Sequence, residues 1–220
     1  KKIITMRIFV IIALLICAFS FTYIYYLKNK KVYIKYTEDG ILDYKVYLRE
    51  NDFFEGEFVE SNKEYVTNLI NYINTDFKYN LKMQEENANY NFAYSVEAVV
   101  DVYRKDNNNS MYNFSEYIVP AEVKSTSERE ITINRFEKID YNKYNELAKS
   151  FISLYNLDNA AATLTINFYV NVTGNSDTFA SNVNNENVYS LCMPLNQNTI
   201  NAEVKSMVKN DEDKVIECKK

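Results

Sequence analysis

The sequence contains no histidine and no tryptophan, and it has only three glycines and two prolines among 220 residues. Without histidine, the chain lacks the usual general base near neutral pH, the commonest metal ligand and every Ser-His or Cys-His nucleophile pair. Glycine is too scarce to build a phosphate-binding loop. We therefore expect no catalytic residues, no cofactor and no metal site, and we do not expect an enzyme.

Cysteine is also scarce, with Cys17, Cys192 and Cys218 far apart in the chain. No two of them form a CxxC pair, so the spacing does not indicate a structural zinc site. Neither their number nor their spacing indicates a disulfide framework, although a bond between Cys192 and Cys218 is conceivable. We expect all three to be unpaired.

Acidic residues outnumber basic ones over most of the chain. The formal net charge is −5, from 25 Lys and Arg against 30 Asp and Glu. Six of the basic residues precede Val32 and no acidic residue precedes Glu38, so the balance from Val32 onward is 19 minus 30, or −11. Such an acidic domain repels phosphate backbones, and we expect no nucleic-acid partner.

An apolar run of 20 residues without a charge extends from Ile8 to Leu27. Its length matches the about 20 residues that a helix needs to cross a hydrocarbon core of about 30 Å. Tyrosines end the run and lysines follow it, as in an interfacial aromatic belt with a basic collar. A cleaved signal peptide is the alternative, because Ala18-Phe19-Ser20 fits the small-x-small rule for cleavage after Ser20. Leu15 and Ile16 before Cys17 do not fit lipoprotein processing.

A retained anchor is the prediction that we adopt. It divides the N-terminal part into a cytoplasmic end (1–7), a transmembrane helix (8–27) that contacts membrane lipid, and a basic juxtamembrane stalk (28–39). Basic residues stand on both sides of the run, so their balance does not decide the orientation. With so short an N-terminus, we expect a single-pass membrane protein whose C-terminal domain is extracytoplasmic.

Two helices and seven or eight strands are predicted beyond the stalk. A capping box at Ser61 and Glu64, with apolar residues at helical spacing, predicts a helix over 62–75. Asp140 as N-cap predicts a second helix over 141–155, with Asn156 as a left-handed terminator. Alternating apolar residues predict strands; the clearest lie at 77–83, 90–102 and 162–174. Further strands are predicted at 42–48, 111–124, 130–137, 188–193 and 200–208.

The strands at 77–83 and 90–102 are predicted to form a long antiparallel hairpin around the polar turn at 84–89. Pro120 marks its strand as an edge or broken strand. Together these elements predict a mainly β fold, an antiparallel β-sandwich with two helical insertions, over 40–209. Residues 210–220 are predicted to be a polar tail, with a second span beyond Lys220 left open.

The stretch YKVYL at 44–48, the pair Phe53-Phe54 and the segment EYVTNLINYINTDFKYNLKM before a Tyr-rich hairpin resemble a family of bacterial and archaeal membrane-anchored ectodomains. That family is a domain of unknown function, and some members are encoded near type I signal peptidases. The resemblance covers most of 40–208 and implies a β-rich extracytoplasmic region. It carries over no catalytic residue, because its motifs are packing patterns.

Three patterns invite a chemical reading, and we prefer a plainer one for each. Ser206 and Lys209 have the SxxK spacing of penicillin-recognising enzymes but lack the accompanying motifs. Asp106 to Ser110 resembles a calcium loop but lacks its glycine and its bidentate glutamate; the loop at 174–187 is judged likewise. The many tyrosines could furnish a carbohydrate or peptide platform, but we ascribe most of them to core packing. Outward residues such as Tyr47 and Tyr103 are too scattered in the sequence to define a site.

These observations predict a membrane-anchored structural or binding module at the cell surface. The alternative is an accessory or sensor ectodomain that partners a membrane or surface-protein processing complex. The sequence does not indicate an oligomeric state or a specific ligand.

Overall fold

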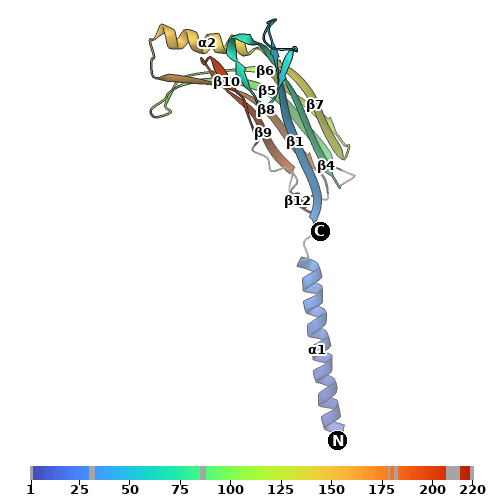
Figure 1. The fold of residues 1–220 in the computed structure, drawn as a ribbon. Coiled ribbons are helices and arrows are strands. Elements are labelled where there is room, and N and C mark those ends of the chain that lie inside the picture. The colour runs from blue at the N-terminus through green and yellow to red at the C-terminus, as the bar shows by residue number, and fades with distance from the viewer. Residues whose placement is uncertain are drawn as a thin grey trace.

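The computed structural model describes residues 2–29, 33–84, 88–177, 179–180, 183–206 and 214–218, with the side chains of α1 described for Ile12 and for residues 14–28. Two antiparallel sheets pack against each other, and one long helix precedes them in the chain. The mainly β, antiparallel class expected from the sequence is confirmed. Figure 1 shows the arrangement.

The helices are α1 (Lys2–Asn29) and α2 (Tyr141–Leu154), and η1 (Thr67–Leu69) is a short 3₁₀ turn. The strands are β1 (Tyr33–Leu48), β2 (Phe58–Glu60), β3 (Glu64–Val66), β4 (Ile70–Met83), β5 (Asn89–Arg104), β6 (Ser110–Thr126), β7 (Glu130–Ile139), β8 (Ala160–Asn175), β9 (Val183–Leu195), β10 (Thr199–Asn201), β11 (Glu203–Ser206) and β12 (Lys214–Glu217).

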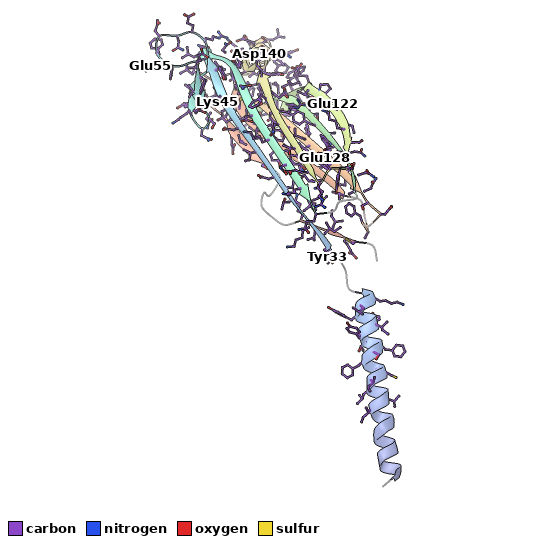
Figure 2. All side chains as sticks on the ribbon, turned by 90° about the vertical axis from the view of Figure 1, so that its right-hand side faces the viewer. Tyr33, Lys45, Glu55, Glu122, Glu128 and Asp140 are labelled. Carbon is purple, nitrogen blue, oxygen red and sulfur yellow. The ribbon has the colours of Figure 1, made fainter. Side chains whose placement is uncertain are left out.

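The first sheet has the order β12-β1-β4-β7, with β2 added beside the far half of β1. β1 begins at Tyr33, four positions after the end of α1 at Asn29, and runs to the opposite end of the sheet. Figure 2 shows Tyr33 at one end of the domain and Lys45 and Glu55 toward the other. We call these the proximal and the distal end.

The second sheet has the order β11-β9-β8-β5-β6. β6 pairs only with β5 among the described residues, so it is an edge strand, as Pro120 predicted. The register between β5 and β6 shifts on both sides of Val96, opposite the segment that contains Pro120. A proline cannot donate to a strand neighbour, and an edge with a bulge accommodates it.

The core lies between the two sheets and consists of alternate residues of each strand. Phe77 of the first sheet stacks on Phe168 and Tyr94 of the second, with ring centroids 5.4 and 5.7 Å apart. Each of the long strands β4, β5, β8 and β9 buries one apolar face almost completely. This is the period-two pattern of the sequence, realised as two inward faces.

The predicted hairpin over 77–83 and 90–102 is wrong, although both strands exist. β4 pairs with β1 and β7 in the first sheet, whereas β5 pairs with β6 and β8 in the second. The two strands therefore face each other across the core instead of sharing hydrogen bonds. Both have one largely apolar face, and burial is equally good when such faces stack between sheets.

The predicted helix over 62–75 is also wrong. β3, η1 and the first half of β4 occupy this stretch. From Ile73 onward the buried residues alternate through Thr75 to Phe77, and each pairs across to β1. Glu64 does not close a capping box, because its carboxylate accepts a 2.7 Å bond from Thr199. Tertiary pairing of a β-branched segment outweighs the weak helical spacing.

The predicted helix over 141–155 is confirmed as α2. The Asp140 carboxylate accepts a 3.2 Å bond from the backbone N–H of Lys143, and Asn156 has φ of +49°. Tyr141, Tyr144 and Ala148 are buried against the distal end of the sandwich. The N-cap and the left-handed terminator could both be predicted from local sequence because they depend on neighbouring residues.

α1 covers the apolar run, and its described side chains are exposed, among them Leu14 at 65%, Phe19 at 74% and Phe21 at 75%. Among the described side chains, all residues of the buried core lie at or beyond Tyr36, so the described part of α1 contributes none. Within the described part of the chain, no helix combines the length and the apolar character of a membrane span. The predicted span over 8–27 therefore has no support from the structure.

Two predicted boundaries differ from the structure. β1 begins at Tyr33, so residues 33–39 of the predicted stalk belong to the first sheet. Within the predicted tail, Lys214–Glu217 forms β12, which pairs with residues 33–36 of β1. Ile216 is buried there, which explains why this short segment docks. Residues 207–213 and 219–220 lie outside the described residues.

Candidate functional site

Three aromatic rings form a row on the outer face of the first sheet, near its distal end. Tyr47 of β1 is directly opposite Phe58 of β2 on one side and Tyr72 of β4 on the other. The rings of Tyr47 and Tyr72 stack with centroids 4.6 Å apart and an interplanar angle of 10°, and Phe58 lies 5.5 Å from Tyr47. We call Tyr47, Phe58 and Tyr72 the aromatic ridge.

A lysine covers each end of the aromatic ridge. The Lys45 ammonium lies 4.3 Å from the centroid of Phe58, and the Lys138 ammonium lies 4.0 Å from that of Tyr72. Lys45 also makes a 3.1 Å ion pair with Glu60. Cations favour the negative face of an aromatic ring, so each lysine covers one ring face of the ridge.

The loop at 49–57, between β1 and β2, exposes two more aromatic side chains. The Asn51 side chain accepts bonds from the backbone N–H groups of Phe53 and Phe54, at 3.0 and 2.9 Å, and donates one to the Arg49 carbonyl. Gly56 has φ of +119°, which favours glycine. This turn presents Phe53 at 86% and Phe54 at 46% exposure.

The aromatic side chains of this surface favour the binding of a partner and not a chemical reaction. Its flat rings bury much area at a small cost in side-chain entropy, and they are typical of binding hot spots. The ring faces within the ridge are already covered by a neighbouring ring or a lysine, so mainly edges and hydroxyls point to solvent. Exposed ring faces remain in the loop, at Phe53 and Phe54.

A second polar cluster lies inside the sandwich at the proximal end. The Glu38 side chain is fully buried and accepts a 2.5 Å bond from the Tyr79 hydroxyl, one from the Asn187 amide, one of 3.3 Å from Asn185 and an ion pair from Lys214. Burial, together with the Glu38 carboxylate, raises the pKa of the Tyr79 hydroxyl. Because four donors of the protein already bind the Glu38 carboxylate, we assign this cluster a structural role.

A cleft of about 510 Å³ separates the free edges of β6 and β7. Phe92, Tyr94 and Ile133 line its apolar part, and charged residues of both strands line its rim. The Tyr94 hydroxyl donates a 3.4 Å bond to the Glu137 carboxylate, and burial raises the pKa of Glu137. The rim residues are Glu122, Lys124, Arg135 and Glu137.

The structure describes the motifs weighed in the sequence only in part. Ser206 ends β11, while Lys209 lies outside the described residues. Asp106 to Ser110 forms the turn between β5 and β6, where Asn108 has φ of +55°. Within the part of the chain that the structure describes, no cluster of three His, Cys, Asp or Glu side chains could hold a metal ion. The three cysteines are unpaired, as expected.

The two outward tyrosines named from the sequence lie in different sheets. Tyr103 lies in β5 of the second sheet, whereas Tyr47 is the centre of the aromatic ridge. Sequence reasoning missed the ridge because Phe58 and Tyr72 lie 11 and 25 positions from Tyr47, with Tyr72 assigned to a helix. Only the pairing of β2, β1 and β4 brings them into one row. Comparisons with protein-family models, with curated proteins and with solved structures find no match to this chain.

Proposed function

We propose that this protein is a membrane-anchored extracytoplasmic binding module at the cell surface. Its binding surface is the aromatic ridge together with Phe53 and Phe54, at the end of the domain farthest from the attachment of α1. The observation that supports this most directly is the row of three adjoining rings on one outer face, together with the 86% exposure of Phe53 in the loop between β1 and β2. Aromatic side chains that gather at the surface in this way are typical of interaction sites.

The ligand class that fits this surface best is a polypeptide. Stacking of a sugar ring on the ridge would need a free aromatic face, and within the ridge the rings of Tyr47 and Tyr72 cover each other. Phe53 and Phe54 extend from a loop and can insert into a concave partner. The lysines and glutamates beside the ridge form a polar rim around an apolar centre, as in protein interfaces.

The anchor in this proposal rests on the sequence. The 20 residues between Arg7 and Lys28 carry no charge, and at a rise of 1.5 Å per residue a helix of that length extends about 30 Å. The apolar side chains that the structure describes in α1, at Ile12 and within 14–28, are exposed and take no part in the buried core. Water is an unfavourable environment for so many adjacent apolar groups.

Site-specific photo-crosslinking on intact cells tests the binding surface. A photoreactive phenylalanine analogue at Phe53 or Phe58 should capture the same partner, because both positions border one surface. The matched control is Tyr117, which is 61% exposed on the outer side of the other sheet and should capture nothing. Tyr72→Ala should weaken capture from Phe53 without loss of folded protein. Equal capture from Tyr117 and Phe53 contradicts the proposal.

The anchor is tested separately. The full chain should stay in the membrane fraction after carbonate extraction, and protease added to intact cells should digest residues 40–209. Release by carbonate, or a mature protein that begins after Ser20, would refute anchoring while leaving the binding surface intact.

A second candidate function is that of an accessory or sensor ectodomain in a membrane or surface-protein processing complex. It is favoured by the unpacked apolar side chains of α1, which can contact another membrane helix. Replacing residues 8–27 with an unrelated apolar segment distinguishes the two: a helix-borne partner is lost, whereas capture from Phe53 persists.

A further inference from the structure

The outer edge of β7 carries a sequence that is complementary to itself. From Ile133 to Ile139 it reads Ile-Asn-Arg-Phe-Glu-Lys-Ile, with Phe136 at its centre. Arg135 and Glu137 flank Phe136 with opposite charges. Asn134 and Lys138 come next, and an isoleucine stands at each end of the segment. In an antiparallel pair of two such strands centred on Phe136, Arg135 faces Glu137 of the second copy and Glu137 faces its Arg135.

The same register aligns the remaining positions. Ile133 faces Ile139 of the second copy, Asn134 faces its Lys138 and Phe136 faces its Phe136. Within one chain, Ile133 and Ile139 are buried on the inner side of the first sheet, and the register with β4 places Arg135 and Glu137 on that same side. Cross-strand pairs of opposite charge and of aromatic residues stabilise a sheet, whereas like charges destabilise it.

The edge of β7 is free to accept a strand. Among the described residues β7 pairs only with β4, and Phe136 is 65% exposed. α2 follows β7 but turns back over its own sandwich, where the Asn142 amide donates 3.0 Å bonds to the carbonyls of Ile70 and Asn71. Unpaired backbone groups along such an edge favour the addition of another strand.

We propose that two copies of this chain associate through antiparallel pairing of residues 133–139 of β7, so that their first sheets join into one continuous sheet. The charge pattern around Phe136 selects a second copy of the same chain as the occupant. The long edge strand β6 of the second sheet does not offer this pattern as cleanly, because Pro120 interrupts it close to its own Glu122-Val123-Lys124 motif.

The pairing has a consequence for how the copies are oriented. β7 runs parallel to β1, because both are antiparallel to β4. Phe136 pairs with Asp76 of β4, and Asp76 pairs with Asp43 of β1, so Phe136 lies in the distal half of the sheet. Antiparallel pairing there overlaps the distal halves and places the two α1 attachments at opposite ends. That arrangement fits chains anchored in two facing membranes. This orientation rests on the proposed anchor, whereas the pairing itself does not.

Charge exchange across the pair provides the test, with the purified full chain in mild detergent and sedimentation velocity as the readout. Arg135→Glu alone and Glu137→Arg alone each place like charges opposite each other and should weaken association about tenfold or more. An equimolar mixture of the two single variants should associate again, because each supplies the charges that the other lacks. The double variant Arg135→Glu/Glu137→Arg should also self-associate.

A second measurement fixes the register. In a chain whose three native cysteines are replaced by serine, Phe136→Cys should form an intermolecular disulfide, because directly opposed residues in antiparallel strands lie about 4.5 to 5.5 Å apart. Val123→Cys on β6, with 67% exposure of Val123, is the matched control and should not. A monomeric wild type, a mixture that does not associate, or equal crosslinking at both positions overturns the proposal. Thermal melts confirm that each variant is folded.

Discussion

Removal of the buried Glu38 carboxylate should destabilise the domain more than any change at a surface ion pair. The Glu38 side chain is fully buried, and it accepts bonds from Tyr79, Asn187, Asn185 and Lys214. Glu38→Ala leaves all four donors without their acceptor. Breaking a buried pair in this way costs about 3 to 5 kcal/mol, and each buried donor left unpaired costs about 1 to 3 kcal/mol.

The partner substitution should cost less. Lys214→Met removes the ammonium but leaves the Glu38 carboxylate bonded to three neutral donors. The Lys214 side chain is 31% exposed, so water already weakens its attraction to Glu38. We expect a loss of about 1.5 to 3 kcal/mol, the range of one hydrogen bond to a charged group.

Urea unfolding of the full chain, followed by circular dichroism, measures both changes by linear extrapolation. Lys78→Met is the matched control, because Lys78 pairs with Asp76 on the exposed outer face of the same sheet, with 56% of its side chain accessible. It should change the free energy of unfolding by less than about 0.5 kcal/mol.

Two results would refute this account of the cluster. A loss below about 1 kcal/mol for Glu38→Ala would mean that its donors find other partners. A larger loss for Lys214→Met than for Glu38→Ala would mean that the docking of β12, and not the carboxylate network, supplies the stability.

Three further predictions concern stability. Gly40→Ala should destabilise the domain by about 1 to 3 kcal/mol in urea unfolding, because the new Cβ would lie 2.0 Å from the Tyr189 hydroxyl; adding Tyr189→Ala should make the loss smaller than the sum of the single losses. Hydrogen bonds from Lys143 and Tyr144 lower the pKa of Glu116. The stability that these bonds supply is therefore present above the usual glutamate pKa and is lost as pH falls through the lowered pKa. The difference in free energy of unfolding between wild type and Glu116→Gln should accordingly shrink between about pH 6 and pH 3. Asp140→Ala should lower Tm by about 2 to 4 °C through loss of the α2 N-cap, with Asp140→Asn nearly neutral.

Local sequence predicted those features that depend on neighbouring residues. The alternation in β5 and β8, the N-cap at Asp140 and the left-handed Asn156 are all present in the structure. It failed at 62–75, where Tyr65, Leu69 and Ile73 fit a helical period although the segment pairs as strands. A short apolar pattern is compatible with both periods, and the neighbouring strand decides between them.

The candidate site was beyond prediction from the chain alone. Asn187, assigned to a loop, is buried against Glu38, and Lys214, assigned to a tail, completes that cluster from β12. Phe58 and Tyr72 join Tyr47 only through the order of strands in the first sheet. Side chains far apart in sequence meet according to strand order and register, neither of which a single strand encodes.

By itself, the sequence determined the β-rich class, the inward face of each long strand, the second helix and the absence of histidine chemistry. The tertiary structure decided which strands pair, and with that the aromatic ridge, the buried Glu38 cluster and the free edge of β7. The physical reason is that alternation specifies which side of a strand is apolar, while the choice of neighbour depends on packing two such faces against each other.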